Sequence, residues 1–183
     1  MSETGFEGKT VVIGVTGSIA AYKAAELVSR LKKAGAEVVV VMTEDAKRFV
    51  GPLTFQTLSC NPVVTDLFAD APRWNPVHVS LADRADVVVV APATANIIGK
   101  AAHGIADDAL SCLVMATRKP VLFAPAMNVN MYENRIVQGN IAKLKELAYH
   151  FVDPEEGYLA CGYEGKGRLA SADSIVAGIE KLL

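Results

Sequence analysis

The sequence predicts an α/β protein with an open, doubly wound, mainly parallel sheet of the Rossmann or flavodoxin-like class, in three α/β/α layers. Short β-branched runs alternate with longer helical stretches along the chain, and several of these runs end in a polar or glycine-rich segment. The chain has 183 residues, 51% of them hydrophobic, which is enough for one domain with a sizeable core. We therefore expect residues 1–183 to form a single domain.

The first half of the chain opens with a clear strand–helix–strand pattern. A β-branched run predicts a strand over Thr10–Val15, and Ser18 is expected to begin a helix that ends before Gly35. Thr43, followed by two acidic residues, is typical of a helix N-cap. The expected strands are residues 10–15 and 38–42, and the expected helices are residues 18–34, 52–60 and 78–85.

The second half repeats the alternation and ends in a helix. The valine run at residues 86–91 suits a strand that is buried on both faces, as in a parallel sheet. Ser171 is expected to cap the last helix, and residues 157–168 are predicted to be a glycine-rich loop. The expected strands are residues 86–91, 120–124 and 149–152, and the expected helices are residues 96–103, 107–117, 134–148 and 171–183.

Charge and cysteine content exclude several classes of protein. The net charge of −2 provides no basic surface for a nucleic-acid partner. The longest apolar run, residues 87–91, is too short to span a membrane, and the first ten residues lack the apolar segment of a secretory signal. Cys60, Cys112 and Cys161 are too far apart for a metal site or a disulfide framework, so a cytoplasmic location is expected. Cys112, in an apolar helix, is expected to be buried.

Five polar segments each follow one of the predicted strands. The carboxyl ends of parallel strands meet at one edge of a sheet, so these segments are expected to converge there. The most unusual one is Pro125-Ala126-Met127-Asn128-Val129-Asn130-Met131, which places an amide and two methionines at the end of an apolar strand. The five segments are residues 16–18, 43–45, 92–96, 125–131 and 161–168.

Two of these segments have the character of a phosphate site. Gly17 and Ser18 lie between a strand and a helix N-terminus, where free amides favour an anion, although the turn matches neither GxGxxG nor a P-loop. The alternative is a tight turn capped by Ser18. Thr94 and Asn96 offer a hydroxyl and an amide to a ligand, or Asn96 simply caps the next helix.

Three further positions carry groups with chemical potential. His78 is a candidate general base, although a lone histidine is often structural. Cys161, between glycine-rich stretches, is a candidate accessible thiol that donates a proton, or an incidental surface cysteine. Asp107 and Asp108 are more simply explained as helix caps, with Ser111 one turn further on and facing the ligand edge.

The combination resembles the flavin-dependent cysteine decarboxylase family over nearly the whole chain, from about residue 9. The PxMNxxM and ACGxxGxGR segments are the specific parts of the resemblance. The matching segments are residues 17–23, His78, and residues 92–96, 125–131 and 160–168.

The resemblance implies that FMN binds at the carboxyl ends of the strands. The chain departs from the family at two positions: Asp108 stands where an Asn is common, and Tyr163 replaces a frequent Asp at a peripheral position. The implied cofactor-binding residues are Gly17, Ser18, Ile19, Thr43, Thr94, Ala95, Asn96, Ser111 and Ala126.

The resemblance also implies a substrate and three catalytic residues. The activity is decarboxylation of 4′-phosphopantothenoylcysteine to 4′-phosphopantetheine in coenzyme A biosynthesis. In this scheme the flavin oxidises the cysteine thiol to a thioaldehyde, loss of CO₂ leaves an ene-thiol, and re-reduction completes the cycle. His78 is the base, Asn128 holds the carboxylate with Met131 nearby, and Cys161 donates the last proton.

Related activities and assemblies stay open at this point. A peptidyl-cysteine decarboxylase shares the fold, the histidine and the asparagine but omits the final reduction. A flavin-binding regulatory protein and a flavin prenyltransferase are further alternatives. Family resemblance implies a homotrimer or a dodecamer of trimers with FMN at subunit boundaries, so that His78 serves a flavin held mainly by a neighbour. The sequence does not distinguish a free-standing enzyme from one half of a fusion with the ligase that makes its substrate.

Overall fold

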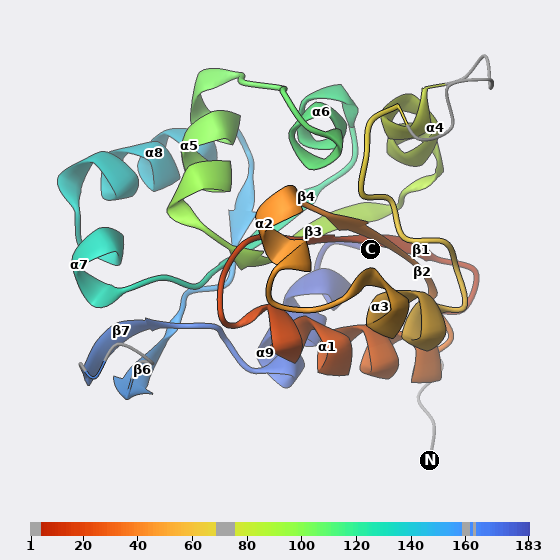
Figure 1. Ribbon diagram of the computed structural model, residues 1–183. Helices are drawn as coiled ribbons and strands as arrows, with labels where there is room; N and C mark the ends of the chain where they lie inside the picture. The colour runs from red at the N-terminus through yellow and green to blue at the C-terminus, as the bar shows by residue number, and fades with distance from the viewer. Residues whose placement is uncertain (1–4, 69–75, 159–161, 163) are drawn as a thin grey trace.

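The computed structural model describes residues 5–68, 76–158, 162 and 164–183, and its centre is a five-stranded parallel sheet (Figure 1). The strand order is β2-β1-β3-β4-β5, with every neighbouring pair parallel. This order confirms the predicted doubly wound, flavodoxin-like class. The strands are β1 Thr10–Val15, β2 Glu37–Met42, β3 Val87–Ala93, β4 Val121–Pro125 and β5 His150–Phe151.

Helices cover both faces of the sheet, which gives the three layers predicted (Figure 1). One face is covered by α1 Ala21–Lys33, α3 Pro52–Ser59 and α9 Ala172–Glu180. The other is covered by α4 Val77–Arg84, α5 Ala95–His103, α6 Ala109–Ala116 and α8 Arg135–Glu146. Two single-turn helices, α2 Glu44–Lys47 and α7 Val129–Tyr132, follow the carboxyl ends of β2 and β4.

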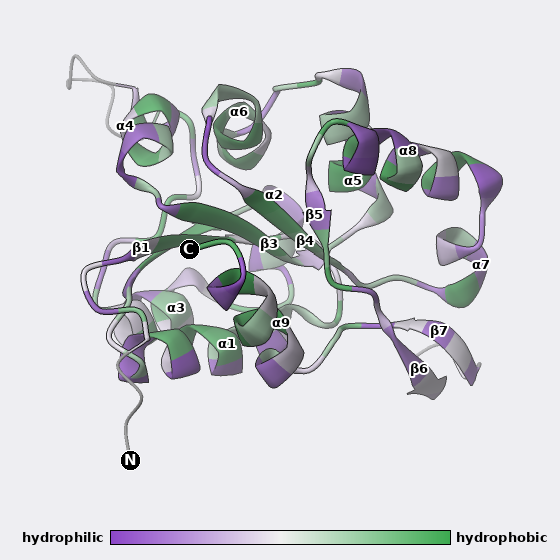
Figure 2. Cartoon of the chain, turned by 180° about the vertical axis from the view of Figure 1, so that it is seen from behind, coloured by the Kyte–Doolittle hydropathy of each residue, from purple (hydrophilic) through white to green (hydrophobic). Residues whose placement is uncertain are grey.

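The core consists of two apolar clusters, one on each side of the sheet. Successive side chains of a strand point to opposite faces, so Val11 and Ile13 pack against the α1 layer whereas Val12 packs against the α5 layer. Figure 2 shows the central strands as a hydrophobic band between the helical layers. Burial on both faces explains why the strands are continuous apolar runs rather than alternating ones.

Helix α1 begins three residues later than expected, at Ala21 instead of Ser18. Ser18 lies in a turn, where its N–H donates to the carbonyl of Thr16 at 2.8 Å and its Oγ accepts the N–H of Ala20 at 3.3 Å. The serine therefore shapes the turn before the helix. Thr43 and Ser171 do cap their helices as predicted, and Asn134 caps α8.

The prediction of a glycine-rich loop over residues 157–168 is wrong at both ends of that range. Residues Glu155–Tyr158 and Glu164–Arg168 form an antiparallel two-stranded sheet, β6–β7, that extends from the main sheet (Figure 1). Gly157 and Gly165 pair directly across it. Glycine-rich composition indicated a loop, but these glycines allow the chain to follow a twisted ladder at positive φ.

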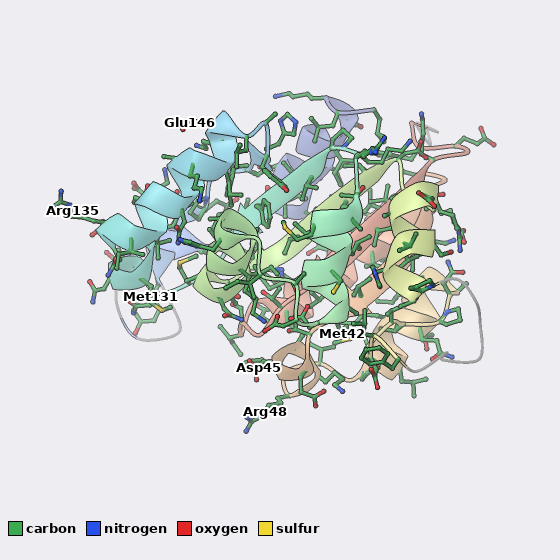
Figure 3. The ribbon with its side chains drawn as sticks, turned by 90° about the horizontal axis from the view of Figure 1, so that it is seen from above. Met42, Asp45, Arg48, Met131, Arg135 and Glu146 are labelled. Carbon is green, nitrogen blue, oxygen red and sulfur yellow. The ribbon has the colours of Figure 1, made fainter. Side chains whose placement is uncertain are left out.

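Several loops gather along the edge formed by the carboxyl ends of the strands. In Figure 3, Met42 at the end of β2, Asp45 on α2 and Met131 on α7 lie along the same side of the molecule. Helix α8 runs away from this side, from Arg135 to Glu146. The predicted convergence of polar segments is thus confirmed for those that the structure describes.

Candidate active site

Two neighbouring pockets at this edge contain most of the predicted site residues. The first, the Asn128 pocket, has a volume of about 550 Å³ and lies between the β1–α1 turn, the end of β4 and the β6–β7 hairpin. Its lining includes Ser18, Ile19, Lys23, Ala126, Asn128, Tyr158 and Arg168. The second, the Thr94 pocket, has a volume of about 380 Å³. Its lining includes Gly17, Thr43, Asp45, Thr94, Ala95, Asn96, Lys100 and Met131.

A buried hydroxyl joins the two loops at the centre of this edge. Thr16 is 2% exposed, and its Oγ1 donates to the carbonyl of Pro92 at 2.6 Å and accepts the N–H of Thr94 at 3.2 Å. These loops follow β1 and β3, between which the chain reverses its winding direction, and ligands bind at such a switch point in doubly wound folds. The sequence placed Thr16 in a site segment but contained no signal for its positioning role.

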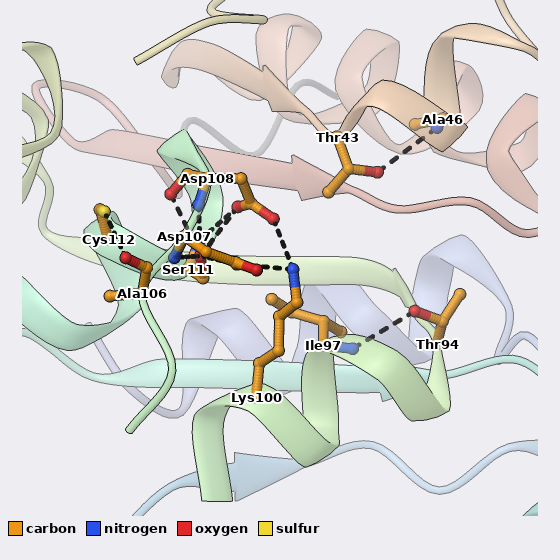
Figure 4. Close-up of polar contacts among 10 residues, drawn as sticks. All are labelled: Thr43, Ala46, Thr94, Ile97, Lys100, Ala106, Asp107, Asp108, Ser111 and Cys112. Atoms are coloured by element: carbon orange, nitrogen blue, oxygen red, sulfur yellow. Dashed lines mark hydrogen bonds and ion pairs between the residues drawn. The ribbon is translucent and has the colours of Figure 1, made fainter. Parts of the chain in front are cut away.

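The Thr94 pocket is rich in hydrogen-bond donors. The first turn of α5 lines this pocket and carries no acidic residue of its own, although Glu44, Asp45 and Asp108 also line the pocket. Within the described part of the chain, the N–H group of Gly17 has no acceptor. Thr43 and Thr94 accept backbone N–H groups at 3.3 and 3.5 Å, which leaves each hydroxyl proton to donate (Figure 4). Such a set of donors suits a phosphate group.

The strand-end segment with the unusual amide is held by backbone hydrogen bonds on both sides. The N–H of Ala126 donates to the carbonyl of Ala93 at 3.0 Å, and the N–H of Met127 donates to the carbonyl of Gly167 at 3.0 Å. The second bond joins the two segments that were most specific in the sequence, although they are about 40 residues apart. Asn128 follows at once, and its Oδ1 accepts the N–H of Asn130 at 2.8 Å.

Close packing between α7 and β7 strengthens this junction. A Cβ atom on Gly165 would lie 2.8 Å from Cγ2 of Val129, and the φ of Gly165 is +157°. A larger residue at position 165 would therefore push the hairpin away from the segment that contains Asn128.

Ser111 does not lie where the sequence analysis expected it. It is 1% exposed, lines neither pocket, and its hydroxyl hydrogen-bonds with Asp107 and Asp108 at the start of α6 (Figure 4). Asp108 caps α6 through the N–H of Ser111 at 2.8 Å, as the simpler interpretation predicted. Ser111 therefore takes part in the α6 cap, and its assignment as a cofactor-binding residue stays a prediction.

Lys100, which sequence analysis overlooked, joins this cap to the Thr94 pocket. Its Nζ lies 2.6 Å from Oδ1 of Asp107 and 3.1 Å from Oδ2 of Asp108 (Figure 4). Burial opposes the charged form of Lys100, but the hydrogen bonds to the two carboxylates prevail and raise its pKa. The same hydrogen bond from Lys100 is the main cause that lowers the pKa of Asp107. Lys100 and Asp107 therefore stay ionised near neutral pH, and Lys100 also forms an ion pair with Asp108 at the pocket wall.

The structure describes two of the three proposed catalytic residues, His78 and Asn128, and does not bring them into one pocket. His78 lies on α4, which packs against α6, and it lines neither pocket. Its Nδ1 is buried without a hydrogen-bond partner among the residues described. Cys161 lies outside the described residues. Asn128 alone of the three lies in a pocket that the structure describes.

Cys112 is less buried than predicted. Its thiol contacts the carbonyl of Ala106 at 3.5 Å (Figure 4), and partial burial, followed by the nearby charges of Asp108 and Asp107, raises its pKa. Cys112, in the first turn of α6, is therefore partly exposed, although the apolar sequence pattern predicted that it would be buried.

The described residues, which omit 1–4 and three internal stretches, contain no group of three or more His, Cys, Asp or Glu side chains that could hold a metal ion. Over the same residues, no helix is both long enough and apolar enough to cross a bilayer.

Solved structures with a similar fold include FMN-dependent cysteine decarboxylases and an FMN-binding protein. A PPC decarboxylase mutant complexed with pantothenoylaminoethenethiol matches with a TM-score of 0.85 and 30% identity, over 94% of this chain and 97% of that one. The FMN-dependent cysteine decarboxylase SpaF matches with a TM-score of 0.81 and 35% identity, over 95% of this chain and 98% of that one.

Sequence relatives point to the same group. The coenzyme A biosynthesis bifunctional protein CoaBC of Bacillus subtilis is 53% identical over 94% of this chain, but the chain spans only 43% of that protein. A probable phosphopantothenoylcysteine decarboxylase of Streptococcus mutans is 45% identical over 96% of this chain and 99% of that protein. The Flavoprotein family matches residues 2–183. With a match over nearly its full length, a doubly wound fold and a donor-rich pocket at the switch point, the chain belongs to the Flavoprotein family.

Proposed function

We propose that this chain removes CO₂ from 4′-phosphopantothenoylcysteine to give 4′-phosphopantetheine, a step of coenzyme A biosynthesis, with FMN as its cofactor. The observation that carries the proposal is the hydrogen bond from Met127 to Gly167, because it places Asn128 beside the hairpin of the second specific segment. The relative from Streptococcus mutans, which the chain spans almost entirely, has the same activity in its name.

The two pockets fit the two ends of FMN. Donors around the Thr94 pocket, from the turn of Gly17 and the hydroxyls of Thr43 and Thr94, would hold the phosphate. Ile19, an apolar side chain of the Asn128 pocket that is 55% exposed, would contact the flat ring. Ala126, only 3% exposed, lines the Asn128 pocket. When bound, FMN supplies a reversible two-electron acceptor for the cysteine side chain.

Asn128 would bind and orient the carboxylate that leaves as CO₂. Its Oδ1 accepts the N–H of Asn130, so the side-chain amide is oriented with its NH₂ group as the donor. A carboxylate requires such a donor. His78 would take the thiol proton, and Cys161 would return a proton to the product. Overall, the substrate loses CO₂ and gains one proton, so the reaction has no net redox change.

We propose that the complete site forms between subunits of a homotrimer, free or stacked into a dodecamer. His78 lines neither pocket of its own chain, so a neighbouring subunit is the natural source of the base. Exposed Tyr22, Met131 and Tyr158 around the pockets would be covered in such an assembly. A cytoplasmic location is part of the same proposal, and free thiols at Cys60 and Cys112 suit a reducing compartment.

An anaerobic absorbance experiment tests the function. Purified protein is expected to be yellow, to bleach when 4′-phosphopantothenoylcysteine is added, and to regain its colour as CO₂ and 4′-phosphopantetheine appear in equal amounts by mass spectrometry. A peptide with a C-terminal cysteine serves as the competing substrate. Faster turnover of the peptide, with release of an ene-thiol, would favour a peptidyl-cysteine decarboxylase. A yellow protein that releases CO₂ from neither substrate would support a regulatory flavoprotein instead.

A further inference from the structure

We propose that Arg168 binds the phosphate at the far end of the substrate and thereby selects phosphorylated substrates. This inference rests on the proposed function, since it assigns one more group of that substrate. The carboxylate and the phosphate lie at opposite ends of an extended acyl chain, so a site for one predicts a separate site for the other.

Arg168 lies where two cavities meet. It lines the Asn128 pocket and also a groove of about 320 Å³ between α1 and α9, and Lys23 of α1 lines both as well. A chain that starts with its carboxylate at Asn128 would therefore pass two cations as it leaves the pocket. Two basic side chains at one junction are a suitable site for a dianion.

These two cations keep capacity to bind an anion. Nε of Arg168 lies 3.7 Å from Oε2 of Glu155, which is too long for a hydrogen bond, and its side chain is 49% exposed. Lys23 has no carboxylate within ion-pair distance among the residues described. Arg30, in the same groove, differs because both Glu26 and Asp173 hold its guanidinium.

The hairpin holds Arg168 in position relative to Asn128. Nη1 of Arg168 lies 3.4 Å from where a Cβ on Gly157 would be, so the guanidinium passes over a bare backbone. The preceding residue, Gly167, accepts the N–H of Met127. One strand thus connects the phosphate end of the proposed site to the carboxylate end.

FMN also carries a phosphate, but its expected position is different. The N-terminus of α5 and the hydroxyls of Thr43 and Thr94 line the Thr94 pocket, and Arg168 is not among the residues that line that pocket. We therefore assign Arg168 to the phosphate of the substrate, and the experiment below separates the two sources.

The test compares kcat/KM for 4′-phosphopantothenoylcysteine and for pantothenoylcysteine, which lacks the phosphate. For Arg168→Gln we expect kcat/KM with the phosphorylated substrate to fall about 10- to 100-fold, and the value for pantothenoylcysteine to stay unchanged. Arg168→Lys should recover part of the loss, because a point charge replaces the guanidinium. Arg118→Gln, an exposed arginine beyond α6, removes the same charge elsewhere and should change neither value.

Three results would overturn the inference. An equal loss with both substrates would give Arg168 a structural role. A weaker affinity of the apoprotein for FMN, but not for riboflavin, with unchanged substrate preference would assign Arg168 to the flavin phosphate. If neither the substrate preference nor the FMN affinity changed, Arg168 would bind neither phosphate. Wild-type protein that turns over neither substrate would instead refute the proposed function.

A second variant tests the inference if Arg168→Gln fails to fold. Glu155→Gln removes the competing carboxylate but keeps an oxygen that can accept the N–H of Ser171, now at 2.8 Å. We expect a lower KM for the phosphorylated substrate only. A lower KM for both substrates, or for neither, would contradict a phosphate site at Arg168.

Discussion

Asn128 is the residue on which the proposed chemistry depends most directly. We expect Asn128→Asp to reduce turnover by roughly two orders of magnitude or more, because a second negative charge would face the substrate carboxylate. FMN should remain bound, since the donors assigned to its phosphate lie in the other pocket. Steady-state rates and the flavin spectrum of the purified variant measure both effects.

A matched control for this change is Asn134→Asp. Asn134 caps α8 by accepting the N–H of Ile136 at 2.9 Å, and an aspartate keeps that bond. Its turnover should match that of the wild type. Near-normal turnover of Asn128→Asp would exclude the carboxylate role.

Thr16 illustrates a position whose importance lies in hydrogen bonds rather than in ligand contact. Thr16→Val keeps the shape of the side chain but leaves the carbonyl of Pro92 and the N–H of Thr94 without their partner. We expect the free energy of unfolding to fall by about 1–3 kcal/mol and FMN affinity to weaken, because the two loops at the switch point lose their link. Urea unfolding and titration of the apoprotein with FMN measure these changes.

The comparison for Thr16 is Thr57→Val, on the exposed side of α3. Its hydroxyl donates to the carbonyl of Leu53 in the same helix, where water can replace it. A change in unfolding free energy within about 0.5 kcal/mol is expected there. Equal effects at the two positions would mean that the loop link is not what Thr16 contributes.

At the scale of elements, the contact between β7 and α7 controls the position of Asn128. Gly165→Ala would place a methyl group 2.8 Å from Val129, so the hairpin must move. We expect turnover to fall roughly 10-fold or more while the main sheet keeps its stability, because a displaced donor weakens substrate positioning. Kinetics together with thermal unfolding distinguish local displacement from global loss.

Gly139→Ala provides the corresponding control in α8. Nothing lies within 4 Å of its added Cβ, and alanine favours a helix over glycine by about 1 kcal/mol. This variant should be as active as the wild type and slightly more stable. If Gly165→Ala behaved in the same way, the junction of hairpin and α7 would have no role in the site.

At the scale of the whole molecule, the separation of His78 from Asn128 makes a prediction about assembly. We expect a mass of three or twelve times the 19.4 kDa chain by light scattering. His78→Asn and Asn128→Asp should each be inactive alone, whereas oligomers that contain both chains should regain part of the activity. Activity is expected to return because some subunit boundaries then combine an intact His78 with an intact Asn128.

His103→Asn is the control for the histidine change, since its Nδ1 contacts the carbonyl of Gly99 on an exposed helix face. It should retain full activity alone. A monomer, or mixed oligomers without any activity, would argue against a site shared between subunits.

Much of the fold was readable in the sequence because burial on both faces leaves a strong pattern. Valine runs identified strands β2 and β3, and Thr43 and Ser171 marked helix starts through their ability to accept backbone N–H groups. The predictions failed where the same local composition is compatible with two different local structures. Ser18 shapes a turn rather than starting a helix, and glycines that suggested a loop at residues 157–168 form part of a hairpin.

The sequence by itself determined the fold class, the family resemblance and the grouping of polar segments at one edge, since alternating strands and helices imply a parallel sheet whose strands share one carboxyl edge. Only the tertiary structure decided which groups meet. It joined Met127 to Gly167, used Thr16 as the link between two loops, placed Ser111 inside a helix cap and brought Arg168 to the junction of two cavities. Such contacts depend on the distance between residues far apart along the chain, which packing sets and which no local pattern records.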